Sequence, residues 1–245
     1  RPDLAVYDTS ETQDLLHPVL WQDNNHLSWV DPASKEVWDY NISIARDAFL
    51  HGFDEINFDY IRFPSDGKTD NMAFPIWDTK KERHLVIKEF FQKLRESFPG
   101  QKISADLFGQ TTINTDDMGI GQVLEDTFEY FDYICPMVYP SHYVSGFIGY
   151  DKPSQYPYEV IKYSIDGAVK RRVAYDKLVN ADASQAPKKL AEIRPWLQDF
   201  NMGADYTADM VKKEITALKD SIKKDYVGYL LWNPSNFYTK EAIIK

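Results

Sequence analysis

The sequence predicts an α/β domain of barrel type, with about five βα units. Short apolar runs alternate with longer amphipathic stretches throughout the 245 residues, and no internal repeat or break in composition interrupts them. Alternation of this kind indicates a parallel sheet with right-handed crossovers. We therefore expect one domain over residues 1–245.

Helix and strand signals follow one another in the order that such a fold requires. Asp31 is the predicted N-cap of the first helix, with Pro32 at its first position, and Gly52 ends it. Thr79-Lys80-Lys81-Glu82 has the pattern of a capping box that opens the second helix, and Thr207 is a further N-cap. The predicted helices lie near residues 32–51, 80–98, 119–130, 156–178, 208–222 and 240. The predicted strands are Glu55–Tyr60, Lys102–Phe108, Tyr133–Tyr139, Ile193–Phe200 and Tyr226–Trp232.

The catalytic candidates lie at the carboxyl ends of these strands, where active groups of parallel α/β sheets gather. An aspartate occurs at or near three of these ends, as Asp59, Asp106 and Asp199. Glycosidic cleavage needs two carboxyl groups, one as nucleophile or base and one as proton donor. Side chains that would orient a sugar beside them are Arg62, Tyr139, His142, Gln198, Trp232 and Asn233.

Each carboxylate also has a structural interpretation. Asp59 is placed to form an ion pair with Arg62, and Asp106 to accept backbone N–H groups of the following loop. Asp199 follows Gln198, and successive strand side chains alternate faces, so the two cannot both point into a regular barrel.

Aromatic residues make up 15% of the chain, with 6 Trp, 16 Tyr and 14 Phe. Most of them are expected to fill the core, and the rest suit a surface on which sugar rings stack. Trp232 fits either use, and His142 fits a loop hydrogen bond as well as a ligand contact.

Composition argues against several other classes of protein. A net charge of −10 disfavours binding to the phosphates of nucleic acids. No run of apolar residues is long enough to span a membrane. Cys135 is the single cysteine, no Cys/His spacing indicates a metal site, and no glycine-rich phosphate loop follows a strand. We therefore expect no cofactor and no metal.

Several long motifs resemble a known bacterial family. They are Trp29-Val30-Asp31-Pro32, Glu36-Val37-Trp38-Asp39-Tyr40-Asn41, Phe53–Pro64, Arg194-Pro195-Trp196-Leu197-Gln198-Asp199 and Leu231-Trp232-Asn233-Pro234-Ser235-Asn236. They are similar to the glycoside hydrolase-like family called domain of unknown function 4015 (DUF4015), over nearly the whole chain. The resemblance implies a TIM-type barrel related to the amylase and α-galactosidase grouping.

The same resemblance implies roles for the three aspartates. Asp59 matches the nucleophile at the end of strand four, and Asp106 the acid at the end of strand five. Asp199 is the candidate for a third carboxylate after strand seven. The acid of those relatives is usually a glutamate, so the shorter side chain of Asp106 departs from their pattern.

The resemblance also implies that the barrel is incomplete. Three βα units precede the Trp29–Pro32 region in the family, whereas only about 28 residues precede it in this sequence. The chain therefore resembles strands four to eight, and an open remnant would expose apolar surface and a sheet edge. We expect a further segment or a second copy of the chain to cover the gap.

The leading hypothesis is hydrolysis of a polysaccharide, of the cell envelope among others, by an extracellular or envelope-associated protein whose signal peptide lies outside this sequence. Carboxyl groups about 5 Å apart would indicate a retaining mechanism, and about 6.5–9.5 Å an inverting one. The alternative is a non-catalytic carbohydrate-binding or scaffold module. A metal-dependent deacetylase is a third hypothesis, which the spacing of the five histidines does not support.

Overall fold

A computed structural model describes residues 1–243 of the protein. Its chain forms two compact units. Unit 1 consists of Arg1–Ile56, Tyr60–Lys102 and Asp116–Val123, and unit 2 of Asn57–Asp59, Ile103–Thr115 and Leu124–Lys245. The single domain expected from the sequence stays a prediction. None of the helices described is both long enough and apolar enough to span a bilayer.

Unit 1 combines long loops with two packed helices, α1 (Lys35–Leu50) and α2 (Arg83–Ser97). The helices meet through Trp38 and Phe90, whose rings stack 5.0 Å apart. A two-residue strand, β1 (Tyr7–Asp8), pairs antiparallel with β3 (Met72–Ala73).

The cap of α1 differs from the sequence prediction. Ser34 is the N-cap residue, and its side chain accepts a hydrogen bond from the backbone N–H of Val37. The carboxylate of Asp31 instead accepts the backbone N–H groups of Ile76 and Trp77, at 2.7 and 2.8 Å. Its other oxygen, Oδ1, accepts the backbone N–H of Ala33 at 2.8 Å, so Asp31 joins the turn before α1 to a loop that is distant in the sequence.

The main sheet follows the order β2-β4-β5-β7-β8, with β6 also paired to β5. These strands are β2 (Glu55–Phe58), β4 (Lys102–Phe108), β5 (Tyr133–Met137), β6 (Glu192–Ile193), β7 (Trp196–Gln198) and β8 (Leu230–Trp232). Five strand positions in parallel form an open half-barrel, so the predicted incomplete TIM-type barrel is confirmed.

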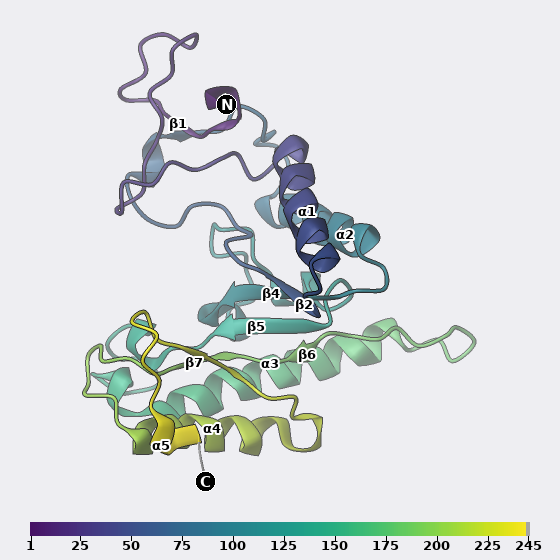
Figure 1. Cartoon of the computed structure of the whole chain (residues 1–245), viewed down its shortest axis with the longest axis vertical. Coiled ribbons are helices and arrows are strands. Elements are labelled where there is room, and N and C mark those ends of the chain that lie inside the picture. Colours follow the sequence, from purple (N-terminus) through teal and green to yellow (C-terminus); the bar gives the residue numbers. More distant parts are fainter. Residues whose placement is uncertain (244–245) are drawn as a thin grey trace. The chain divides into compact units, whose positions relative to one another are not determined.

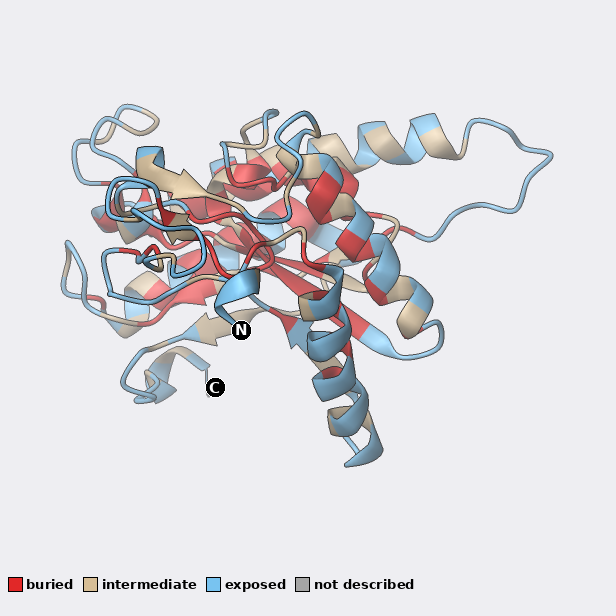
Figure 2. Ribbon diagram, turned by 90° about the horizontal axis from the view of Figure 1, so that it is seen from above, coloured by how far each residue is buried: buried red, intermediate tan, exposed pale blue. Residues whose placement is uncertain are grey.

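In unit 2, α3 (Pro157–Val179) and α4 (Ala208–Ile222) lie side by side along one face of the sheet (Figure 1). The short helix α5 (Lys240–Ile243) packs against α4. The strand residues that alternate toward this helical layer are apolar, and Ile134 and Leu197 are fully buried. Buried residues accordingly concentrate in the strands and on the inner sides of the helices (Figure 2).

The opposite face of the sheet carries polar and aromatic side chains. We call it the polar face. Strand alternation and register assign to it Asn57, Ser104, Asp106, Tyr133, Arg194, Trp196, Gln198 and Trp232. It is the face that would line the interior of a closed barrel.

Several predicted elements are shorter or interrupted. The strands predicted over Glu55–Tyr60, Tyr133–Tyr139 and Tyr226–Trp232 are observed as Glu55–Phe58, Tyr133–Met137 and Leu230–Trp232. The helix expected over residues 119–130 is reduced to the 3-10 turn Leu124–Asp126, because Gly119 and Gly121 adopt φ values of +67° and +81°. The strand expected over 193–200 is divided into β6 and β7. Pro195 lies between them and has no N–H to donate to the ladder.

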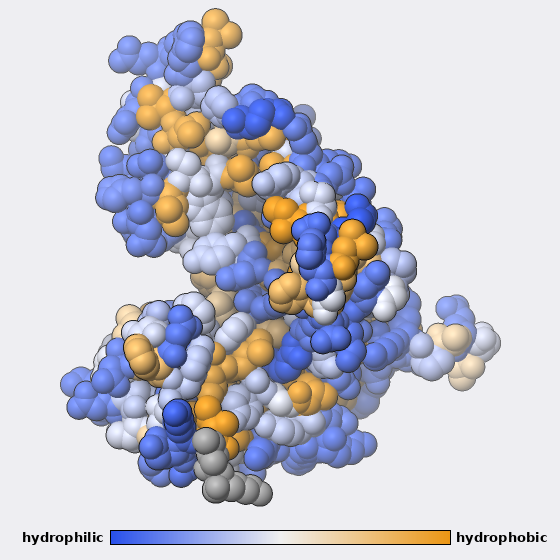
Figure 3. All heavy atoms as spheres, viewed as in Figure 1, coloured by the Kyte–Doolittle hydropathy of each residue, from blue (hydrophilic) through white to orange (hydrophobic). Residues whose placement is uncertain are grey.

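Hydrophilic residues cover most of the surface in the view of Figure 3, with apolar residues scattered among them.

Candidate active site

Asp106 is the most deeply buried carboxylate on the polar face. It lies two residues before the end of β4, where Ser104 and Asp106 alternate with the apolar Ile103 and Ala105. Only 5% of Asp106 is exposed. A carboxylate at this depth is costly to ionise unless hydrogen bonds stabilise it.

Two side chains from other strands hold the Asp106 carboxylate. Its Oδ1 accepts hydrogen bonds from Asn57 Nδ2 at 2.8 Å and from Trp196 Nε1 at 2.7 Å. Asn57 is fixed in turn, since its Oδ1 accepts a 3.0 Å hydrogen bond from the Ser104 hydroxyl. Strands β2, β4 and β7 therefore converge on one carboxylate.

The surroundings raise the pKa of Asp106 from 3.8 to about 6. Burial is the largest cause, and the negative charge of Asp59 raises the pKa further. The hydrogen bonds from Asn57 and Trp196 and the charge of Arg194 act in the opposite direction. A carboxyl group with this pKa can hold a proton in mildly acidic solution and release it near neutrality.

Asp59 directly follows β2 and is exposed to solvent. The charge of Asp59 raises the pKa of Asp106, so these two of the three predicted catalytic aspartates interact electrostatically. One is buried with a raised pKa and the other is solvated, which is the difference that separates a proton donor from a nucleophile or base.

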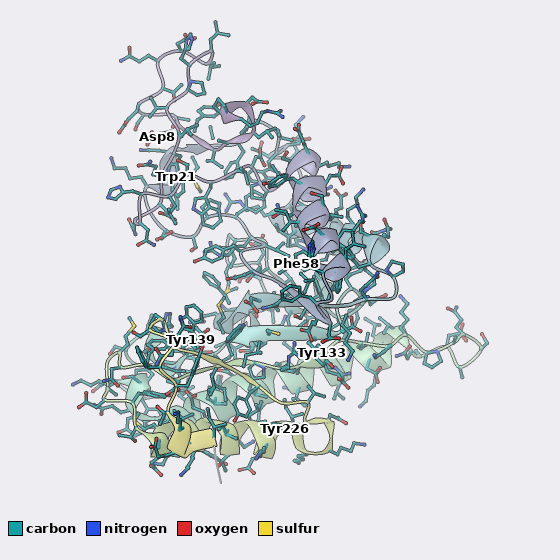
Figure 4. The ribbon with its side chains drawn as sticks, in the orientation of Figure 1. Asp8, Trp21, Phe58, Tyr133, Tyr139 and Tyr226 are labelled. Carbon is teal, nitrogen blue, oxygen red and sulfur yellow. The ribbon has the colours of Figure 1, made fainter. Side chains whose placement is uncertain are left out.

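Tyr139 and His142 lie at the carboxyl end of β5, as Figure 4 shows for Tyr139 in contrast to Tyr133 at the other end. The ring of Tyr139 is 5.2 Å from the ring of His142 and 5.7 Å from that of Phe200. Burial and then the charges of Asp106 and Asp59 raise the pKa of the Tyr139 hydroxyl, which therefore stays protonated. Burial lowers the pKa of His142.

Trp232 offers a partly exposed aromatic surface next to Trp196. It is 43% exposed, and its ring stands nearly perpendicular to that of Trp196, with centroids 6.1 Å apart. Trp196 connects the indole of Trp232 to the carboxylate of Asp106. The next residue, Asn233, donates from Nδ2 to the carbonyl oxygens of Asp199 and Phe237, which fixes the loop after β8.

Gln198 and Asp199 make contacts that hold loops together. Gln198 is fully buried; its Oε1 accepts from the Ser141 N–H at 3.1 Å, and its Nε2 donates to the Phe200 carbonyl at 2.9 Å. The carboxylate of Asp199 accepts both the N–H and the hydroxyl of Thr239, at 2.8 and 2.6 Å. The catalytic role of Asp199 stays a prediction, and these contacts are those of an anchor for the C-terminal segment.

Arg62 belongs to unit 1 and is nearly buried. Its guanidinium lies over the rings of Trp29 and Tyr60, and Nη1 donates to the Phe63 carbonyl at 3.0 Å and to the Ser65 hydroxyl at 3.2 Å. Its role in sugar binding also stays a prediction.

Sequence reasoning missed Asn57, Trp196 and Glu214. Alternation within Glu55–Tyr60 could have placed Asn57 on the same face as Asp59. Glu214 on α4 is fully buried, and its carboxyl group accepts hydrogen bonds from the Tyr206 hydroxyl and from the Gln198 N–H. Burial raises its pKa well above the ordinary value. Within residues 1–243, no group of His, Cys, Asp and Glu side chains is arranged to hold a metal ion.

A solved glycoside hydrolase domain has a similar fold. The glycoside hydrolase domain of PgaB (BpsB) from Bordetella bronchiseptica is 14% identical, with a TM-score of 0.55, and the match covers 93% of this chain and 64% of that one. A hypothetical protein from Ruminiclostridium thermocellum is 39% identical over 49% of this chain and 51% of that chain, with a TM-score of 0.35. The chain thus spans just under two thirds of the Bordetella bronchiseptica structure and about half of the Ruminiclostridium thermocellum structure.

No curated protein matches the sequence. A protein family, in contrast, matches residues 2–238, and its description is “Putative glycosyl hydrolase domain”. The match covers almost the whole chain and agrees with the half-barrel and with the resemblance of its motifs. The chain belongs to this glycosyl hydrolase-like family, DUF4015.

Proposed function

We propose that the protein hydrolyses O-glycosyl bonds of a polysaccharide, with Asp106 as general acid and Asp59 as nucleophile or stabiliser of the transition state. The observation that carries the proposal is the buried carboxyl group of Asp106, whose pKa is raised to about 6 beside the charge of Asp59. Two carboxyl groups in unlike environments are what glycosidic cleavage requires.

In the proposed reaction, protonated Asp106 gives its proton to the glycosidic oxygen as the bond to the anomeric carbon breaks. The carboxylate of Asp59 has one of three roles. It stabilises the positive charge that develops on the sugar, attacks the anomeric carbon itself, or activates a water molecule that attacks this carbon. Water then forms the new bond to the anomeric carbon and gives its proton to the ionised Asp106, or to Asp59 where Asp59 activates the water.

Aromatic side chains would hold the sugar chain in this proposal. The C–H face of a sugar ring can stack on the exposed part of Trp232, while Tyr139 and His142 supply polar groups at the same end of β5. The substrate would be a polysaccharide outside the cell or in its envelope, where we propose that the protein acts.

The second candidate function is binding of a carbohydrate without cleavage. It is favoured by the hydrogen bonds from Asn57 and Trp196, which hold Asp106 as they would a structural carboxylate. It also agrees with the aspartate found where related enzymes usually carry a glutamate.

Release of reducing ends from a panel of polysaccharides by the 245-residue chain tests the proposal. Asp106→Asn and Asp59→Asn should each lower kcat by about 100-fold or more, because each removes a group that acts in the transition state. Asp54→Asn is the matched control for Asp59→Asn, since Asp54 is an exposed carboxylate that directly precedes β2, the strand that Asp59 follows.

Full activity of both the Asp59 and the Asp106 variants would refute the assigned mechanism. Binding of a polysaccharide without turnover by the unsubstituted chain would favour the second candidate.

A further inference from the structure

Tyr60 combines an exposed ring with an unusual backbone conformation. The residue follows Asp59 directly, is 63% exposed and adopts a φ of +57°. This left-handed region is unfavourable for bulky residues, whereas glycine or asparagine adopts it readily. The sequence thus retains an aromatic ring in a position where a small residue would fit the backbone better.

Neighbouring side chains in unit 1 fix the direction of this ring. The guanidinium of Arg62 lies 4.9 Å from the centroid of Tyr60 and 4.8 Å from that of Trp29, and the two rings are 5.8 Å apart. Trp29 is anchored through Nε1, which donates a 3.0 Å hydrogen bond to Asp23 Oδ2. Arg62 is anchored by Ser65, whose hydroxyl accepts from Nη1.

The contacts with Arg62 and Trp29 orient the ring of Tyr60 before any ligand binds. A preorganised ring loses little conformational entropy on binding, which favours recognition of flexible chains. We call Tyr60, Trp29 and Arg62 the Tyr60 platform.

The chemistry of the platform favours an uncharged sugar. Aromatic faces carry partial negative charge and attract the weakly positive C–H groups of a sugar ring. Arg62 is only 9% exposed and its guanidinium is stacked, so it does not present a cation to an anionic ligand. The nearby carboxylate of Asp23 and the net charge of −10 further disfavour acidic sugars.

We infer that the Tyr60 platform is a binding subsite of unit 1 for a neutral sugar residue, with Tyr60 as the stacking surface. This inference rests on the proposed function in one respect, because it takes the ligand of the protein to be a carbohydrate.

Binding to an array of neutral oligosaccharides, built from hexoses and N-acetylhexosamines, tests the inference with hydrolysis disabled. The background is the full chain carrying Asp106→Asn. Adding Tyr60→Asn should weaken binding of the recognised oligosaccharides by about 5- to 10-fold, because the backbone conformation is kept and the ring is lost. Tyr60→Phe keeps the ring and should retain the affinity.

Tyr40→Asn is the matched control, since Tyr40 is an exposed tyrosine of unit 1 on α1. It should leave affinity unchanged. Equal affinity of the Tyr60→Asn and Tyr60→Phe variants, or no binding to any oligosaccharide of the array, would overturn the subsite.

The two proposals fail in different ways. Binding that depends on Tyr60, together with no hydrolysis by the unsubstituted chain, would refute the proposed function and keep the subsite. Hydrolysis that depends on Asp106, together with binding that does not depend on Tyr60, would refute the subsite and keep the proposed function.

Discussion

Trp196 Nε1 donates a 2.7 Å hydrogen bond to Oδ1 of Asp106, although β5 lies between their strands in the sheet. The indole therefore reaches across one strand to stabilise the ionised form of a buried carboxyl group. This bond lowers the pKa of Asp106 against the larger effect of burial. The proton affinity of the candidate acid depends on this balance.

In the unsubstituted chain, the alkaline limb of the pH dependence of kcat/KM should have a midpoint near pH 6, the pKa of Asp106. Trp196→Phe should move this midpoint to higher pH, because loss of the hydrogen bond destabilises ionised Asp106. Trp77→Phe is the control, since Trp77 Nε1 donates to the Lys81 carbonyl within unit 1. A limb that stays in place or moves to lower pH in the Trp196 variant would show that this bond does not tune the acid.

Asp106→Asn should change the free energy of unfolding, compared with the unsubstituted chain, more favourably at pH 8 than at pH 4. The pKa of Asp106 rises from 3.8 to about 6 on folding, so the folded state binds the proton more tightly. Stability from this group is present below the lower value and is lost as pH rises toward 6. The relative gain of the variant between the two pH values is on the order of 1–3 kcal/mol.

Urea unfolding of the Asp106→Asn variant and the unsubstituted chain at pH 4 and pH 8 measures this difference. A variant that loses stability relative to the unsubstituted chain as pH rises would mean that hydrogen bonds to the ionised carboxylate outweigh its burial.

Glu214→Ala should lower the free energy of unfolding by about 2–4 kcal/mol, because the buried Tyr206 hydroxyl and Gln198 N–H both lose their acceptor. Glu214→Gln should cost less than about 1 kcal/mol, since an amide can serve both partners and remains uncharged. Thermal and urea unfolding compare the two. Equal losses would indicate that the charge of Glu214, rather than its hydrogen bonds, matters for the fold.

A double-mutant cycle on Asp199 and Thr239 should give a coupling energy of about 1 kcal/mol, because both oxygens of the carboxylate accept from Thr239. Asp199→Ala, Thr239→Ala and the double variant are compared by urea unfolding. Additive losses would show that the contact does not stabilise the fold. A large fall in kcat for Asp199→Asn at unchanged stability would support the catalytic role expected from the sequence.

The residues on regular strands were the ones that sequence could predict. β4 has the expected bounds, Lys102–Phe108, because its apolar residues alternate with polar ones and Pro99-Gly100 separates it from the preceding helix. Asp106 could therefore be placed near a strand end before the structure was known.

Contacts that depend on register between distant strands could not be predicted in this way. Trp196 and Asn57 reach Asp106 from positions 90 and 49 residues away in the sequence. Propensity also failed at Gly119 and Gly121, where positive φ values end a pattern that otherwise suits a helix. Asp199 shows a third limit, since its position after a strand suggested chemistry while its partner Thr239 became visible only in the fold.

The central claim is that Asp106 gives a proton to the departing sugar, and the dependence of rate on the leaving group tests it most directly. The measurement compares kcat/KM of Asp106→Asn and of the unsubstituted chain on the polysaccharide and on a 2,4-dinitrophenyl glycoside of the same sugar. An activated leaving group departs without a proton, so we predict a loss of about 100-fold or more on the polysaccharide and of less than about 10-fold on the dinitrophenyl glycoside. Equal losses on both substrates would contradict the account.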